Sequence, residues 1–239
     1  MMAIEFRPRP VFIAALQREI AAVVHGWRAD ETLPARHIHL YWNNDAIVAC
    51  AGMGADRASL AVEAALALGP ASELISVGWA GACNEGLKIG DVFRPGTVID
   101  AKTGERFLIS EPDTTKEKQI LVTVAKPAGV VEKQRLGVTY SASAVDMEAA
   151  AVARSARTRE LPFSVIKAIS DDADFELPDM QQFSTSSGQF REAAFGLHVA
   201  VRPTLWSPVM AMAKSSRLAA QRLRVAIEEH IQNCRERTP

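Results

Sequence analysis

Residues 74–82 read Leu-Ile-Ser-Val-Gly-Trp-Ala-Gly-Ala, and this stretch decides how the rest of the sequence is interpreted. Residues 74–77 are predicted to form a short buried strand, because they are mostly apolar and a glycine follows directly. The glycines at 78 and 81 predict that a tight loop closes this strand. In an open α/β sheet ligands bind beyond the carboxyl ends of the strands, so the loop is a candidate binding element.

Outward from this stretch, candidate strands alternate with candidate helices. The other expected strands are 11–16, 37–42, 46–51, 92–100, 120–124 and 163–169. The expected helices are 17–24, 56–68, 147–157 and a C-terminal helix at about 208–234. The polar stretch 103–118 is expected to be a surface loop. This alternation, with no linker long enough to divide it, predicts a single three-layer α/β/α domain over residues 1–239 with a mixed, partly closed central sheet.

Composition excludes several classes of protein. Lys and Arg number 27 and Asp and Glu 28, so the formal net charge is -1, whereas nucleic-acid binders usually show a basic excess. Cys50, Cys83 and Cys234 form no Cys-x-x-Cys pair, and the histidines are scattered, so we expect neither a metal site nor a disulfide framework. No apolar run reaches the ~18 residues of a membrane span. We therefore expect a cytoplasmic protein that does not bind nucleic acid.

Polar residues gather where the predicted strands end. Glu19 follows the first strand, Gly52-Met53-Gly54 the third, and Ser170-Asp171-Asp172 the last, while Asp146-Met147-Glu148 stands at a helix start. Taken singly, each has a plainer interpretation: a solvated helix residue, a turn, a solvated loop or a helix cap. Only their combination indicates a site.

The order of these segments resembles one family. Residues 76–82 followed by Leu-Lys-Ile-Gly-Asp-Val (87–92) resemble the glycine-loop signature of the nucleoside phosphorylase/nucleosidase family. Val-Asp-Met-Glu-Ala-Ala-Ala-Val-Ala (145–153) resembles its ribose-binding segment, and Ala-Ile-Ser-Asp-Asp-Ala-Asp (168–174) its catalytic aspartate segment. The resemblance covers about residues 11–175. The branches that it favours are the 5′-methylthioadenosine/S-adenosylhomocysteine nucleosidases and the hopanoid-associated phosphorylases.

The resemblance implies a nucleoside phosphorylase-like fold and cleavage of the N-glycosidic bond of a 5′-modified purine nucleoside. Asp171 would be the acid that protonates the leaving base near N7, with Ser170 orienting it. Glu148 would hold the ribose hydroxyls close to the developing positive charge. Met147 would pack beneath the sugar, where a flexible thioether suits an irregular surface.

The nucleophile stays open between water and phosphate. Glu19 takes the place of the nucleosidase residue that activates water, which favours hydrolysis. The hexameric phosphorylases carry an arginine for phosphate near position 76, where this chain has a serine, and Arg57 is a candidate substitute. Trp79 departs from the small polar residue of the nucleosidases and either narrows the pocket or turns outward. The resemblance implies further substrate-binding residues in the glycine loops: Gly54, Gly78 and Trp79.

The stretch after the aspartate is rich in large apolar residues. They are Phe175, Leu177, Met180, Phe183, Phe190, Phe195, Leu205 and Trp206. They indicate either a packing layer or subunit contact, or a pocket for an apolar 5′ substituent, from methylthio to a hopanoid. The expected apolar stripe of the C-terminal helix is Met210, Leu218, Ala219, Leu223, Ala226 and Ile231. The helix also carries Lys214, Arg217, Arg222 and Arg224, and is interpreted as a packed helix or as a basic amphipathic helix at a membrane surface.

Two other functions were weighed. One is a non-catalytic nucleoside-binding protein of the same fold, in which Trp79 blocks the nucleophile. The other, a nucleotide-binding oxidoreductase, is disfavoured because residues 52–54 lack the Gly-x-Gly-x-x-Gly spacing. The expected partners are a small-molecule nucleoside and further copies of the chain, as a homodimer or larger homo-oligomer. No cofactor is expected, with inorganic phosphate as the alternative co-substrate.

Overall fold

The computed structural model describes residues 7–110, 119–176, 194–195, 202 and 206–237. The strands are β1 (Arg9–Ala14), β2 (Arg28–Ala29), β3 (His39–Trp42), β4 (Ile47–Cys50), β5 (Ala71–Ala82), β6 (Val92–Phe93), β7 (Thr97–Asp100), β8 (Arg106–Leu108), β9 (Ile120–Thr123), β10 (Ala144–Asp146) and β11 (Phe163–Asp171). The helices are α1 (Gln17–Ile20), the 3-10 helix η1 (Leu33–Arg36), α2 (Ala55–Ala67), α3 (Val130–Tyr140), α4 (Ala149–Thr158) and α6 (Trp206–Glu236).

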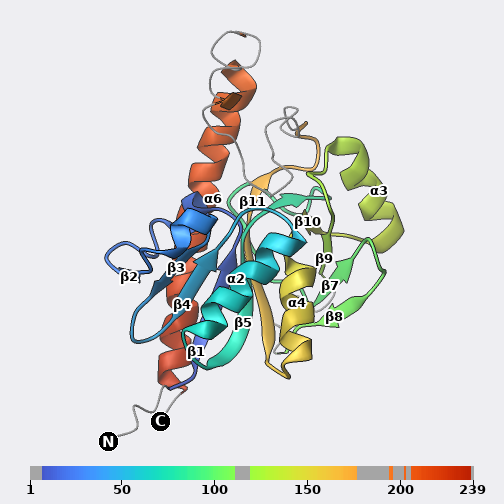
Figure 1. The fold of residues 1–239 in the computed structure, drawn as a ribbon. Helices are drawn as coiled ribbons and strands as arrows, with labels where there is room; N and C mark the ends of the chain where they lie inside the picture. The colour runs from blue at the N-terminus through green and yellow to red at the C-terminus, as the bar shows by residue number, and fades with distance from the viewer. Residues whose placement is uncertain (1–6, 111–118, 177–193, 196–201, 203–205, 238–239) are drawn as a thin grey trace, which may run out of the picture.

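All described strands join one mixed sheet that branches at β5. The main path runs β2-β3-β4-β1-β5-β10-β9-β7-β8, and β11 pairs with β5 and β6 off this path. The expected mixed sheet and three layers are confirmed (Figure 1). The expected partial closure is not found, because no pairing among the described residues joins the two ends of the sheet. Because the long strand β5 pairs with three other strands, the sheet branches there and does not close into a barrel.

The two faces of the sheet are covered by different helices (Figure 1). Side chains of a strand alternate between faces, and β1 shows this with Val11 and Ile13 in one core and Phe12 and Ala14 in the other. The first core contains buried residues of α2 and α4, and the second contains residues of α6. The sheet is therefore apolar on both faces, as its nearly continuous apolar strands indicate.

Several expected elements differ in the structure. The strand predicted at 74–77 continues through the glycines to Ala82, and the strand predicted at 92–100 is split into β6 and β7. The helix predicted at 17–24 ends at Ile20. Part of the predicted loop 103–118 forms β8, and its residues 111–118 lie outside the described residues.

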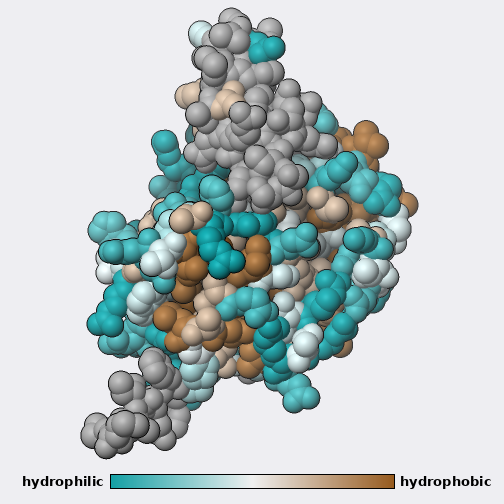
Figure 2. All heavy atoms as spheres, viewed as in Figure 1, coloured by the Kyte–Doolittle hydropathy of each residue, from teal (hydrophilic) through white to brown (hydrophobic). Residues whose placement is uncertain are grey.

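Helix α3 was not predicted from the sequence, because three of its residues have a burial opposite to their polarity. Val131 and Val138 are 80% and 89% exposed, whereas Lys133 is fully buried (Figure 2 shows the apolar surface over α3). A periodicity argument places valines inside and lysine outside, so it finds no helix stripe here.

The C-terminal helix α6 is found where it was predicted and packs on the sheet through part of its predicted apolar stripe. Ala219, Leu223 and Ala226 are buried, which supports the packed-helix interpretation. Met210 and Leu218, expected in the same stripe, are 71% and 38% exposed. The first turns of α6 therefore extend beyond the core.

No helix among the described residues combines the length and the apolar character that crossing a bilayer requires.

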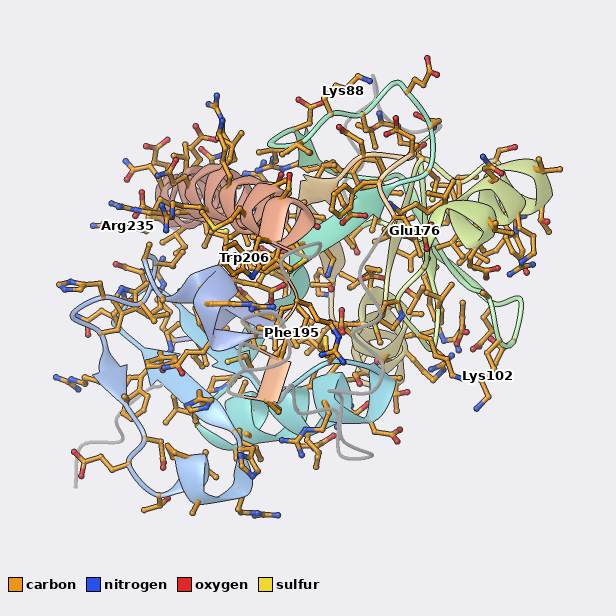
Figure 3. The ribbon with its side chains drawn as sticks, turned by 90° about the horizontal axis from the view of Figure 1, so that it is seen from above. Lys88, Lys102, Glu176, Phe195, Trp206 and Arg235 are labelled. Atoms are coloured by element: carbon orange, nitrogen blue, oxygen red, sulfur yellow. The ribbon has the colours of Figure 1, made fainter. Side chains whose placement is uncertain are left out.

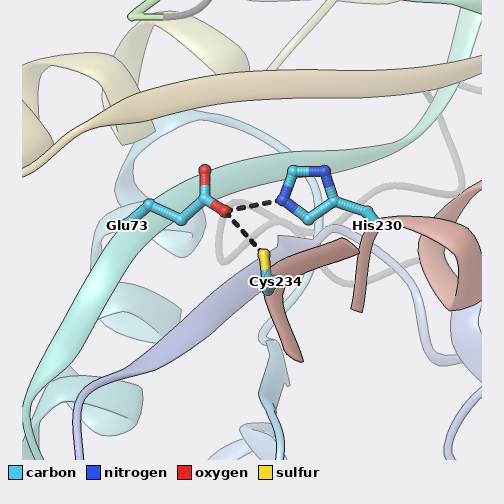
Figure 4. Close-up of side chains that lie close together, drawn as sticks. All are labelled: Glu73, His230 and Cys234. Atoms are coloured by element: carbon cyan, nitrogen blue, oxygen red, sulfur yellow. Dashed lines mark hydrogen bonds and ion pairs between the residues drawn. The ribbon is translucent and has the colours of Figure 1, made fainter. Parts of the chain in front are cut away.

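The far end of α6 is held to the beginning of β5 by three side chains (Figure 4). His230 Nε2 lies 2.6 Å from Glu73 Oε1, and Cys234 Sγ lies 3.6 Å from the same oxygen. Ser164 donates a hydrogen bond to the other carboxylate oxygen at 3.2 Å. Burial alone lowers the pKa of His230, but its hydrogen bonds with Cys234 and Glu73 and the Glu73 charge outweigh this and raise it to about 9.

This contact predicts a pH-dependent stability. The pKa of His230 is about 9 in the folded chain and about 6.5 in an unfolded one, so the stabilisation is complete below pH ~6.5 and is lost as the pH rises through about 9. We expect the melting temperature of the wild type to fall more steeply between pH 7 and 10 than that of Glu73→Gln. The exposed His25→Gln is the control and should follow the wild type. Parallel pH curves for wild type and Glu73→Gln would contradict the assignment.

Candidate active site

A cavity of about 610 Å³ opens where β1, β5 and β11 end, beside the beginning of α4 and the first half of α6. Six residues predicted for the site line it: Glu19, Trp79, Met147, Glu148, Ser170 and Asp171. The other two predicted residues, Gly54 and Gly78, are not among the lining residues. They lie against the carboxyl groups of two lining residues, outside the cavity, as described below.

Glu19 is fixed by the backbone. Its Oε2 accepts hydrogen bonds from the N–H groups of Ala15 (3.1 Å) and Leu16 (2.8 Å), and its Oε1 accepts one from Trp79 (3.1 Å). Gly78 has φ +127°, and a Cβ there would lie 3.1 Å from both carboxylate oxygens, so a glycine is required. Burial raises the pKa of Glu19, although these hydrogen bonds oppose the shift. The result is a rigid carboxyl group that is a stronger base than an exposed glutamate.

Beneath the cavity, Lys167 of β11 is a buried cation. Its Nζ lies 3.0 Å from Asp146 Oδ2 and donates to the Val77 carbonyl at 3.2 Å, and the residue is only 1% exposed. Burial lowers the pKa of Lys167, but attraction to Asp146, Glu148 and Glu19 outweighs this and raises it. One lysine therefore offsets the charge of three carboxyl groups in a dry interior.

Glu148 precedes α4 and connects two loops. The N–H of Gly54 donates to its Oε1 at 2.7 Å, and the N–H of Met147 donates to its Oε2 at 3.3 Å. Burial raises the pKa of Glu148 to about 7, with Lys167 acting against the shift and Asp146 adding to it. The carboxyl group can therefore accept hydrogen bonds from ribose hydroxyls or take up a proton near neutral pH.

Asp171 ends β11 and lies between two donors. Ser170 Oγ donates to its Oδ1 at 2.6 Å, as the predicted orienting role requires, and Lys133 Nζ donates to its Oδ2 at 2.5 Å. A Cβ at Gly81 would lie 2.7 Å from the same Oδ2, so only a glycine leaves room for the pair. The sequence analysis missed Lys133. One signal was available in the sequence: Lys133 lies three residues before Leu136, which places both side chains on one side of a helix, and Leu136 is buried.

Trp79 lines the cavity and is also packed against the second core. Its indole ring lies 5.1 Å from the Arg18 guanidinium carbon, within range of a cation–π contact. Arg57, the candidate phosphate ligand, instead donates to the backbone carbonyls of Ala51 and His37, the latter at 2.7 Å, and does not line the cavity. The predicted substitution of Arg57 for a phosphate-binding arginine therefore has no geometric support.

One side of the cavity is largely apolar. It is lined by Phe195 and by residues of the first half of α6: Val209, Met212, Ala213 and Ala220, with the polar Ser216 and Arg217 between the last two. Of the apolar residues singled out in the sequence, Phe195 lies over the sheet, whereas Trp206 is 53% exposed at the beginning of α6 (Figure 3). Leu177, Met180, Phe183, Phe190 and Leu205 lie outside the described residues.

The potential metal ligands of the described residues lie elsewhere. Within that part of the chain, the one group of three His, Cys, Asp or Glu ligand atoms within 4.8 Å of one another is Glu73, His230 and Cys234. Glu73 lies near the beginning of β5, whereas the cavity lies at the end of this strand. This group is therefore separate from the candidate site.

Comparison with known families supports the resemblance seen in the sequence. A model of the phosphorylase superfamily matches residues 11–135 and 113–201. No curated protein sequence matches the chain.

Solved structures of similar fold include three hydrolases of nucleosides or related compounds. Futalosine hydrolase of Helicobacter pylori has 18% identity and a TM-score of 0.65, with 93% of this chain and 98% of that chain covered. The 5′-methylthioadenosine/S-adenosylhomocysteine nucleosidase from Neisseria meningitidis, in complex with methylthio-immucillin-A, has 18% identity and a TM-score of 0.64, with coverage of 91% and 96%. Arabidopsis thaliana 5′-methylthioadenosine nucleosidase has 22% identity and a TM-score of 0.61, with coverage of 82% and 97%. At these identities the likeness shows a shared fold.

The buried charge network predicts the effect of removing its cation. Lys167→Met leaves the neighbouring carboxyl groups without their counter-charge, so we expect a loss of about 3–5 kcal/mol in the free energy of unfolding at pH 8. The loss should shrink at pH 5, where Glu148 is protonated and neutral. Urea unfolding at both pH values measures it, with the exposed Lys88→Met as control. An equal loss at both pH values would show that packing, not charge, is responsible.

Proposed function

Because the chain belongs to the phosphorylase superfamily, we propose that it is an enzyme that cleaves the N-glycosidic bond of a 5′-modified adenine nucleoside. The observation that carries the proposal is the convergence of Glu19, Glu148 and Asp171 on one cavity. These residues come from three distant segments of the chain, and each is fixed by hydrogen bonds to neighbouring groups. A protein that only binds nucleosides has no need of three buried carboxyl groups around one ligand.

The chemistry divides between the two ends of the bond. Breaking C1′–N9 leaves positive charge on the ribose and negative charge on the purine. Glu148, held by the N–H of Gly54, accepts hydrogen bonds from the ribose hydroxyls and stabilises the positive charge. Asp171, oriented by Ser170, serves the purine near N7, where a proton neutralises the leaving base.

Water is the nucleophile that the geometry favours. Glu19 is a rigid, buried carboxyl group with a raised pKa, which suits it to take a proton from water. Arg57 is occupied by backbone carbonyls and lies away from the cavity lining. Arg18 and Arg217 do line the cavity, so they are the candidate anion ligands if the reaction depends on phosphate.

The apolar side of the cavity is proposed to hold the 5′ substituent. Phe195, Val209 and Met212 offer no partner for a charged group, whereas an alkylthio or larger hydrocarbon substituent would be buried against them. Methylthioadenosine is the small end of this class, and an adenosine joined to a hopanoid is the large end.

The reaction is tested by adenine release from methylthioadenosine, with and without phosphate, with mass analysis of the sugar. We expect free methylthioribose in both buffers. Asp171→Asn should lower kcat by about 100-fold or more, because it removes the acid, while nucleoside binding changes much less. Asp174→Asn, three residues away and exposed, is the matched control. Binding of nucleosides without release of base from any of them would support the non-catalytic alternative.

The 5′ specificity is tested with adenosines that carry 5′-alkylthio chains of increasing length. Each buried methylene adds about 0.8 kcal/mol, so kcat/KM should rise by up to about four-fold per methylene until the cavity is full. Met212→Glu places a charge on the apolar side and should abolish the gain. Met210→Glu, on the same helix but 71% exposed and outside the cavity lining, should keep it. A gain that survives Met212→Glu would place the substituent elsewhere.

A further inference from the structure

Lys133 is a buried lysine on a helix that leaves apolar side chains exposed. It lies on α3 and is 0% exposed, although α3 leaves two of its valines largely in solvent. Removing an ammonium group from water costs several kcal/mol unless it is paired and hydrogen-bonded. Its Nζ is 2.5 Å from Asp171 Oδ2, 2.7 Å from the Asp172 carbonyl and 3.4 Å from the Phe175 carbonyl. Its three protons are therefore all directed to the residue that serves the leaving base and to the segment that follows it.

The other titratable groups around this pair are turned to different partners or are neutral. Burial raises the pKa of the Cys83 thiol to about 12, so it stays uncharged. Glu132 pairs with Arg135 at 2.6 Å. The remaining two acids accept backbone N–H groups: Asp172 from Ile89 and Glu176 from Val130 (Figure 3 shows Glu176 beside α3). Among the described side chains that contact Asp171, Lys133 is the one cation.

We propose that Lys133 is a positioning residue that is paired with Asp171 in the resting enzyme and supplies the proton that Asp171 passes to the leaving purine. This inference rests on the proposed function. It changes the role expected for Asp171, because the proton is held by the ammonium group of the lysine and not by the carboxylate that contacts it. Asp171 transfers this proton to the base.

The proton balance of this step closes. When C1′–N9 breaks, its electron pair moves into the purine, Lys133 gives a proton to Asp171, and Asp171 gives a proton to N7. The pair changes from ammonium and carboxylate to amine and carboxylate, and the base leaves neutral. Water adds its hydroxyl group to C1′ and gives its proton to Glu19. Exchange with solvent then removes that proton and restores the one on Lys133.

Three substitutions separate this role from a structural one. Lys133→Arg retains the positive charge and the donors, but a guanidinium does not give up a proton at any working pH. Lys133→Met removes charge and proton together, and Asp171 must then take its proton from solution, which a carboxyl group does only in acid. Gln134→Met, on the exposed side of the same helix, is the matched control.

The experiment is the pH profile of kcat and KM for each variant from pH 5 to 9, with the best nucleoside found for the wild type. At pH 7.5 we expect kcat to fall by about 100-fold or more in both Lys133 variants, with KM within about three-fold of the wild type. The loss in Lys133→Met should shrink at least ten-fold at pH 5, whereas the loss in Lys133→Arg should persist. Circular dichroism confirms folding, and Lys133→Gln replaces the methionine variant if that one does not fold.

Two results would overturn the inference: full activity of Lys133→Arg, or a loss in Lys133→Met that is the same at every pH. A wild type that releases no base from any nucleoside would defeat the proposed function, and the inference with it. With an active wild type, the Lys133 variants decide the inference alone.

Discussion

The ion pair between Lys167 and Asp146 is the interaction on which the candidate site depends. Three buried carboxyl groups near Lys167 line the cavity, and desolvation would neutralise or expel them without a counter-charge. Lys167 provides that charge from β11, where the strand register pairs it with Gly78 of β5. The same glycine leaves room for Glu19. The central strand pairing therefore sets both the charge and the space around Glu19.

The part of the cavity around Asp171 repeats this arrangement with different residues. Gly81 of β5 again leaves the space, Asp171 of β11 supplies the carboxylate, and Lys133 supplies the cation. Two separate lysines thus serve the two ends of the bond that is proposed to break. Charges held in place before the reaction need no reorganisation during it, which is how buried polar networks contribute to catalysis. The cost is the free energy of desolvation of two buried cations, which packing in the rest of the fold must offset.

Helix α6 links this packing to specificity. Its second half is buried against the sheet by Leu223 and Ala226, and its end is held by the contact of His230 with Glu73. Its first half projects past the core and borders the apolar side of the cavity. An anchored helix therefore presents a largely apolar wall to the cavity. The length of α6 and its contacts with the sheet therefore set the size of the cavity on its apolar side.

The sequence by itself determined the alternating α/β architecture, because apolar periodicity reports which residues face a core. It also determined six residues that line the cavity, because polar groups at strand ends and three ordered motifs mark a site at one edge of a sheet. Only the tertiary structure decided that β5 branches, that Trp79 lines the cavity, and that Lys133 and Lys167 are buried near it. A lysine in a sequence is by default a solvated residue, and its burial depends on carboxylates that are 21 and 38 positions away along the chain. Such pairing is a property of the folded sheet and not of any local pattern.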